Sequence, residues 1–252
     1  MRYKLICCEV FYREICQALL ESKHTVFPVF TRKLSHEVPE YLREMIQQEI
    51  DSADPSEFDY ILLGFGLCGN AITGLKASRV PLVIPRAHDC CTLFLGSREA
   101  FKRHFGDRPS CRWTSGGYMG TGDHYLRNSE VYQFLGLDLS WDALVEKYGI
   151  ENAEYIRETL TPKDGSDEQV VFIKTPPYDQ FDFQQQAERD AALHGRKFEI
   201  IQGDMRLLQL LVGDHWPENE FLIVPPGCTV EGVYDHDAVI RIGENSEADS
   251  AD

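Results

Sequence analysis

The sequence lacks any long hydrophobic run. None of its segments approaches the roughly eighteen apolar residues that span a bilayer. The first ten residues, MRYKLICCEV, also lack the long apolar core of a signal peptide. We therefore expect a cytoplasmic protein with no membrane partner. Hydrophobic residues make up 43% and charged residues 26% of the 252 positions, proportions typical of a folded globular chain.

Basic residues are few relative to acidic ones. The chain has 25 Lys and Arg against 41 Asp and Glu, and its formal net charge is −16. Such a field repels phosphate backbones, so we exclude nucleic acid as a partner. Part of the charge lies in the final residues, GENSEADSAD, which have little to bury and are predicted to form a disordered end.

The eight cysteines do not have the pattern of a small secreted disulfide scaffold. The chain is too long for that class, and two of its cysteine pairs are adjacent, Cys7 with Cys8 and Cys90 with Cys91. These residues are therefore interpreted as thiols, metal ligands or ordinary core residues.

Apolar runs rich in β-formers alternate with helical patterns along the first hundred residues. Strands are predicted at 3–10, 25–30, 60–66 and 80–86, with helices at 11–22 and 35–51. Strands joined by helices of this length pair in parallel through right-handed crossovers. The pattern thus predicts an α/β sheet with helices on both faces.

The same alternation resumes after residue 168, which predicts two Rossmann-like lobes with largely parallel sheets. The segment between them is glycine-rich around CRWTSGGYMGTGDHY and then helical, so it is interpreted as an insertion that either covers a ligand or simply connects the lobes. The expected divisions are a first lobe at 1–105, the insertion at 106–165, a second lobe at 166–235 and an acidic tail at 236–252.

Three loops follow predicted strands: GFGLCGN, PRAHDC and PPGCTVEG. Loops at the carboxyl ends of parallel strands face the ligand crevice of an open α/β sheet. In the first loop, glycines permit close backbone approach, and a helix starting at Asn70 would direct N–H groups at an anion or a thiolate. Gly64, Gly66 and Gly69 match GxGxxG, but no acidic residue ends a strand about 20 residues later, which disfavours a dinucleotide site.

Cys68, His88 and Cys90 provide three soft or borderline metal ligands from two neighbouring strand ends. Three such ligands form the open set of a catalytic zinc site, or part of an iron site. Cys7 or Cys228 would supply a fourth ligand. We predict a bound metal ion on this basis, with zinc favoured over an iron–sulfur cluster.

The same residues also fit readings without a metal. His88 would activate a nucleophilic cysteine, with Asp89 orienting the ring, or Cys68 and His88 would be packed structural residues at strand ends. Arg86 is suited to bidentate recognition of an anionic ligand. The predicted ligand-binding residues are Arg86, Gly66, Gly69, Asn70 and Asp89.

Several strings resemble a known family. YILLGFGLCGN, PLVIPRAHDCCTLFLGSRE, YGIENAEYI, GDMRLLQLL and FLIVPPG are similar to markers of the DUF1638 family of bacteria and archaea. The resemblance covers nearly the whole chain apart from the tail, and it implies an association with corrinoid-dependent methyltransferases in anaerobic one-carbon metabolism. It places the family's typical ligand-type residues at Cys7, Cys68, His88 and Cys90. The sequence departs from the family at WTSGGYMG, which puts a role for Trp113 in doubt.

Three functional hypotheses follow. The leading one is a metal-binding protein with a Cys/His site in a crevice between the lobes, acting on an anionic small molecule in corrinoid or methyl-transfer metabolism, with a corrinoid or methyltransferase protein as partner. The first alternative is a metal-free binding or accessory protein of a methyltransferase system. The second is a Cys-dependent hydrolase or transferase. The residues fit an enzyme and a binding protein equally well.

Overall fold

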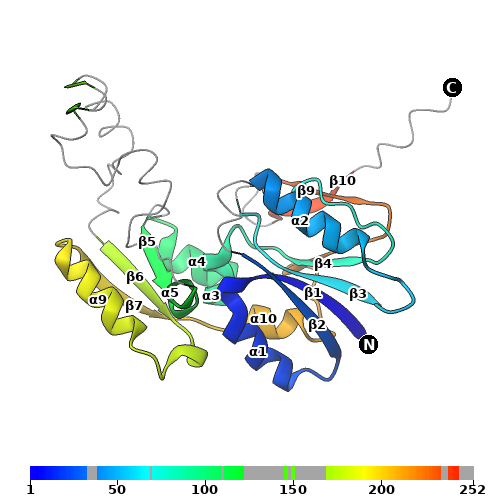
Figure 1. Ribbon diagram of the computed structural model, residues 1–252, viewed down its shortest axis with the longest axis horizontal. Helices are drawn as coiled ribbons and strands as arrows, with labels where there is room; N and C mark the ends of the chain where they lie inside the picture. Colours follow the sequence, from blue (N-terminus) through cyan, green and yellow to red (C-terminus); the bar gives the residue numbers. More distant parts are fainter. Residues whose placement is uncertain are drawn as a thin grey trace. The chain divides into compact units, whose positions relative to one another are not determined.

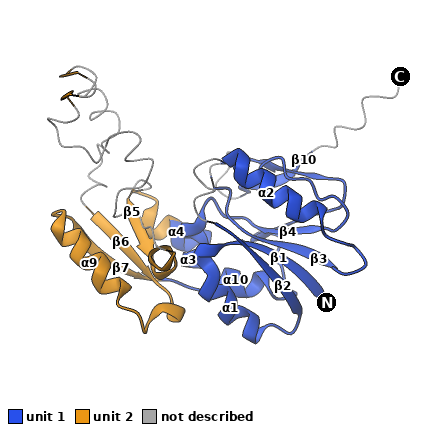
Figure 2. Cartoon of the chain, in the orientation of Figure 1, with its two compact units in different colours: residues 1–101, 203–252 blue, residues 102–202 orange. Residues whose placement is uncertain are grey.

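The computed structural model describes residues 1–32, 39–68, 70–108, 111–121, 145–146, 149–150, 169–233 and 238–243. The chain forms two compact units (Figure 2). Unit 1 comprises residues 1–101 and 203–252, and unit 2 comprises residues 102–202. None of the helices in these described ranges combines the length and the apolarity needed to cross a membrane.

Unit 1 is built on a five-stranded sheet with the order β2-β1-β3-β4-β8. Its strands are β1 (Arg2–Cys8), β2 (Thr25–Thr31), β3 (Tyr60–Gly64), β4 (Leu82–Pro85) and β8 (Phe221–Val224). The first four pair in parallel, and β8 runs antiparallel to β4. Six of the seven residues of β1 are buried, as expected for a central strand covered on both faces. The predicted α/β class with a largely parallel sheet is confirmed.

Helices cover both faces of this sheet (Figure 1). Helices α1 (Tyr12–Glu21), which follows the short η1 (Glu9–Phe11), and α10 (Arg206–Leu211) lie together on one face, and α2 (Pro39–Asp51) lies on the other. Helix α2 buries Leu42, Ile46 and Ile50, a spacing of four residues that forms one apolar stripe. The helix was predicted to begin at residue 35, and residues 33–38 lie outside the described residues.

The connection from β3 to β4 departs from the prediction. The expected helix starting at Asn70 is absent from residues 70–81, which form turns and a single bridge between Lys76 and Thr229. Two short helices, α3 (Cys90–Leu95) and α4 (Arg98–Phe105), follow β4 instead. The reason is steric and local: Asn70 has a φ of 70°, a left-handed conformation that does not continue into a right-handed helix.

Unit 2 contains a parallel sheet with the order β5-β6-β7. Its elements are β5 (Arg112–Ser115), α5 (Gly116–Gly120), β6 (Gln169–Lys174), η4 (Pro176–Tyr178), α9 (Phe183–Leu193) and β7 (Lys197–Gln202). Its core joins Met119 of α5 to Val170 and Phe172 of β6 and to Ala187 and Ala191 of α9. Residues 112–120, which were expected in the insertion, thus form β5 and α5 of unit 2. Most of the predicted insertion after residue 121 lies outside the described residues.

The segment after residue 202 was expected in the second lobe, but its strand β8 extends the sheet of unit 1. It continues into an antiparallel pair, β9 (Thr229–Gly232) and β10 (Ile240–Gly243). Residues 240–243 were assigned to the acidic tail, and β10 corrects that assignment for these four positions. Residues 244–252 of the tail lie outside the described residues.

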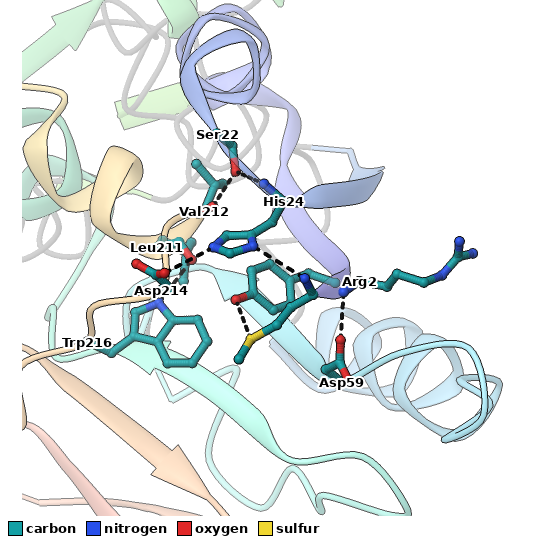
Figure 3. A network of polar contacts seen from close by, with 10 residues as sticks. Arg2, Ser22, His24, Asp59, Leu211, Val212, Asp214 and Trp216 are labelled. Atoms are coloured by element: carbon teal, nitrogen blue, oxygen red, sulfur yellow. Dashed lines mark hydrogen bonds and ion pairs between the residues drawn. The ribbon is translucent and has the colours of Figure 1, made fainter.

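Polar contacts fasten the residues after α10 to the turn between α1 and β2 (Figure 3). The Ser22 hydroxyl donates to the Val212 carbonyl at 2.7 Å, and the Trp216 indole donates to the Leu211 carbonyl at 3.1 Å. The His24 ring lies 3.5 Å from the Asp214 carboxylate. This end of the sheet is thus held by side chains that satisfy backbone carbonyls at the end of a helix.

Candidate functional site: three thiols at the carboxyl edge of the sheet

Cys8, Cys68 and Cys90 meet at the carboxyl ends of three neighbouring strands. Cys8 is the last residue of β1, Cys68 follows β3 by four positions, and Cys90 begins α3 after β4. These strands are adjacent and parallel in the order β1-β3-β4, so their ends lie at one edge. All three cysteines belong to unit 1.

The loops after β3 and β4 continue the pairing of their strands. The Leu67 N–H donates to the Ala87 carbonyl at 2.8 Å, and the Cys68 N–H donates to the His88 carbonyl at 3.0 Å. Gly66 makes this approach possible, because a Cβ atom there would lie 2.6 Å from the nitrogen and the Cα atom of Asp89. Cys68 is thereby placed beside residues 88–90.

Cys68 has a backbone conformation that is uncommon for its residue type. Its φ angle is 46°, in the left-handed region that usually holds glycine, asparagine or aspartate. The backbone bonds from Leu67 to Ala87 and from Cys68 to His88 help to hold the loop in this conformation. Backbone strain of this kind concentrates at functional positions.

Asp89 caps helix α3. Its carboxylate accepts hydrogen bonds from the Thr92 N–H at 3.0 Å and from the Thr92 hydroxyl at 3.2 Å. Burial raises the pKa of Asp89 above its usual value, while these bonds and the nearby His88 oppose the rise. Capping accounts for this residue, which was predicted to bind a ligand, and it fixes Cys90 as the first residue of the helix.

The Cys90 thiol is the centre of the cluster. Its Sγ atom lies 3.9 Å from Sγ of Cys68. Hydrogen bonds with the thiols of Cys68 and Cys8, followed by burial, raise the pKa of Cys90 well above its usual value. Cys90 is 2% exposed, Cys8 is buried and Cys68 is half-buried. Cys68 is therefore the residue of the three that solvent molecules reach most easily.

Cys7 lies apart from this cluster, although the sequence predicted it as the ligand from β1. Adjacent residues of a strand point to opposite faces, so Cys7 and Cys8 diverge. The Cys7 thiol donates to the carbonyls of Gly64 at 3.4 Å and of Cys8 at 3.5 Å, and burial is the main cause of its raised pKa. Sequence reasoning missed Cys8. The alternation of side chains along a strand could have indicated that Cys8 shares a face of β1 with Lys4 and Ile6, opposite to the face of Cys7.

Arg86 is engaged by backbone carbonyls. Its Nε atom donates to the Glu218 carbonyl at 2.9 Å, and Nη1 donates to the carbonyls of Ala238, at 2.7 Å, and Ile240. Burial lowers the pKa of this guanidinium. These bonds connect the end of β4 to the residues before β8 and to β10, which accounts for an arginine at this position without an anionic ligand.

The remaining predicted residues are placed as follows. His88 accepts the Cys68 N–H through its carbonyl, and its ring lowers the pKa of the adjacent Asp89. The exposed Asn70 accepts a bond from Arg43 through its carbonyl, at 2.9 Å. Cys228 lies in the turn between β8 and β9, where its carbonyl accepts the Ala77 N–H. Gly69 lies outside the described residues.

The described side chains do not form a preorganised metal-binding site. Within that part of the chain, no three or more His, Cys, Asp or Glu side chains are already arranged to hold one metal ion. The site is thus a pair of thiols in contact, with a third thiol hydrogen-bonded to one of them.

One family model matches the chain. It is described as "Protein of unknown function (DUF1638)" and covers residues 30–212, a span that includes Cys68, His88 and Cys90 and begins after Cys8. No curated protein and no solved structure matches the chain.

Proposed function

The chain belongs to the DUF1638 family, and we propose that it binds a thiophilic divalent metal ion, zinc in preference to an iron–sulfur cluster, through the thiolates of Cys8, Cys68 and Cys90. His88 is the proposed fourth ligand. The proposal keeps three of the residues predicted from the sequence and replaces Cys7 with Cys8.

The observation that carries the proposal is the separation of two sulfur atoms. Tetrahedral zinc holds thiolates at about 2.3 Å, which places two of them about 3.8 Å apart. The Sγ atoms of Cys68 and Cys90 lie 3.9 Å apart. A zinc ion could therefore bridge this pair without a change in their separation, and only the remaining ligands would need to turn toward it.

The third thiol is already close to the pair. Cys8 hydrogen-bonds the Cys90 thiol, so a rotation about its side-chain bonds is the smallest movement that adds a third sulfur. Each thiol that becomes a ligand releases its proton, so affinity rises with pH. In the absence of a metal, the thiols of Cys68 and Cys8 raise the pKa of Cys90 and so disfavour its thiolate. A divalent cation bound by all three sulfur atoms would reverse this effect, because its charge stabilises the three thiolates together.

A zinc ion held by these residues would supply Lewis acidity. With its fourth position open, it would activate a bound thiol or water, and with His88 in that position the site would be closed and structural. Displacement of His88 by a substrate would give the open form, which suits a protein of methyl-transfer or corrinoid metabolism, the setting implied by the resemblance of the sequence. The proposal accordingly includes a small-molecule substrate and a methyltransferase partner, without the anion that Arg86 was expected to bind.

The test is the metal content of protein purified anaerobically, without chelator or nickel affinity resin. Plasma mass spectrometry should find about one zinc per chain. Cys68→Ser and Cys90→Ser should each lose most of it, and Cys8→Ser should lose it too. Cys7→Ser is the matched control, because Cys7 is adjacent in sequence but bonds to Gly64 instead, and it should retain the metal.

Three outcomes would count against the proposal. Protein that stays metal-free after incubation with zinc would move the assignment to the metal-free binding protein. Loss of zinc from Cys7→Ser with retention in Cys8→Ser would restore the ligand set expected from the sequence. Rapid alkylation of Cys90 in metal-free protein would instead favour a nucleophilic cysteine, which its raised pKa disfavours.

A further inference from the structure

We propose that Cys68 and Cys90 form a reversible disulfide, with Cys68 as the thiol that first reacts with a small-molecule disulfide. The inference uses the thiol cluster of the proposed function and adds a redox activity to it. Both residues are in the thiol form in the structure. Their sulfur atoms are 3.9 Å apart, and a disulfide requires about 2 Å, so side-chain rotation must close the difference.

The backbone holds the two cysteines at a suitable separation. Cys68 pairs with His88 through its N–H, and Cys90 is two residues further along. The Asp89 cap fixes the start of α3, so Cys90 is the stationary partner. Cys68 lies in a turn with a strained backbone, and its side chain is therefore the one expected to move.

Exposure sets the order of the reaction. Cys68 is half-buried, whereas Cys90 is 2% exposed. The Cys68 thiolate attacks one sulfur of a disulfide such as oxidised glutathione, forming a mixed disulfide and releasing one glutathione thiolate, which takes up a proton. Once Cys68 is in the mixed disulfide, its thiol no longer contributes to the raised pKa of Cys90. Cys90 then loses its proton to solvent, attacks the Cys68 sulfur and releases the second glutathione. Two protein thiols are oxidised and one small disulfide is reduced to two thiols.

Other pairings of the cluster are less accessible. Cys8, at the end of β1, and Cys90, to which it is hydrogen-bonded, are both buried, so a reagent reaches neither of them before Cys68. Cys7 points away from the cluster toward Gly64. Formation of the Cys68–Cys90 disulfide removes two of the three proposed metal ligands, so oxidation releases the metal and the bound metal protects the thiols.

The experiment treats metal-free, fully reduced full-length protein with excess oxidised glutathione and then blocks the remaining thiols. Peptide mapping should find Cys68 joined to Cys90, whereas the exposed Cys16 has no partner thiol in this cluster and can only take up glutathione. Cys90→Ser should accumulate a mixed disulfide with glutathione on Cys68. Cys68→Ser should protect Cys90 from the reagent, and Cys16→Ser, which removes an exposed cysteine of α1, should behave as the parent.

Dithiothreitol should restore all eight thiols. A stable mixed disulfide on Cys68 in the parent protein would overturn the inference, as would a cross-link between any other pair. Since the oxidation is measured without metal and zinc binding is measured on reduced protein, the two ideas fail separately. Zinc binding without the disulfide would refute the redox step alone, and the disulfide without zinc binding would refute the metal site alone.

Discussion

Gly66 lies directly against the backbone of Asp89. A Cβ atom at position 66 would be 2.6 Å from the Asp89 nitrogen and 2.8 Å from its carbonyl carbon, and these are backbone atoms that cannot rotate away. The contact joins the loop after β3 to the residue that caps α3, and so it sets the positions of Cys68 and Cys90 relative to each other.

Replacing Gly66 with alanine should destabilise unit 1 and disturb the thiol pair. The methyl group forces the two loops apart, and overpacking of this kind costs about 1–3 kcal/mol. Denaturant unfolding measures the cost, and the yield of the Cys68–Cys90 cross-link reports the geometry. Gly120→Ala is the control, because its nearest neighbour would be at 3.4 Å, and it should change stability by less than about 0.5 kcal/mol.

Two substitutions of Asp89 distinguish the contribution of its capping hydrogen bond to stability from that of its negative charge. Asp89→Ala removes the acceptor for Thr92 and should cost about 1 kcal/mol of unfolding free energy. Asp89→Asn keeps an oxygen in the same place and removes a buried carboxylate, so it should retain the stability of the parent. Denaturant unfolding at neutral pH compares the three proteins. Equal losses in both variants would mean that the negative charge itself is needed at this position.

Much of the sheet could be predicted from the sequence, because β1, β3 and β4 are short apolar runs whose burial is visible locally. The pairing of β8 with β4 was not predictable in this way. These strands are far apart in the sequence, and the apolar run of β8 resembles that of a parallel strand. Strand β5 was missed for a different reason, because the glycines that follow it suggested a loop. Gly116 is instead explained by packing, since a Cβ atom there would clash with the Tyr178 side chain.

The sequence grouped Cys68 with Cys90 and chose Cys7 where the structure brings Cys8 to them, and binding of a ligand by these residues stays a prediction. Neighbouring parallel strands made it possible to group Cys68 with Cys90. The choice between Cys7 and Cys8 depended on which face of β1 is directed toward α3. The alternation of side chains along a strand indicates only that the two cysteines lie on opposite faces. Arg86 was interpreted as an anion-binding residue because the carbonyls that it bonds come from segments more than a hundred residues away.

Arg86 should contribute to the stability of unit 1. Arg86→Ala removes bonds to the carbonyls of Glu218, Ala238 and Ile240, the last two in a partly buried setting, so it should cost about 2–4 kcal/mol. Arg98→Ala removes a bond to the single carbonyl of Asn219 and should cost about 1 kcal/mol. Denaturant unfolding compares the two. An Arg86 variant of parent stability that loses affinity for an anion such as phosphate would instead assign it to ligand binding.

Tyr3 should ionise at a higher pH than an ordinary tyrosine, and the free energy of unfolding should therefore decrease at alkaline pH. Burial, and then the charge of Asp214 and Asp59, raises the pKa of Tyr3 from 10.0 to about 12. The unfolded chain therefore loses this proton at a lower pH than the folded one, so the stability that Tyr3 contributes is complete below pH 10 and is lost as the pH rises toward 12.

The measurement is tyrosine absorbance near 295 nm during a titration, combined with unfolding at each pH. Tyr3→Phe should remove one late-titrating tyrosinate and flatten the decline in stability over this range, since phenylalanine keeps the ring contacts with His24 and Trp216 but carries no proton to lose. Tyr41→Phe, at an exposed position of α2, should leave both the late component and the decline intact. If Tyr3→Phe titrates like the parent protein, the late component belongs to another tyrosine, and the charges of Asp214 and Asp59 do not act on this ring in the way that its position implies.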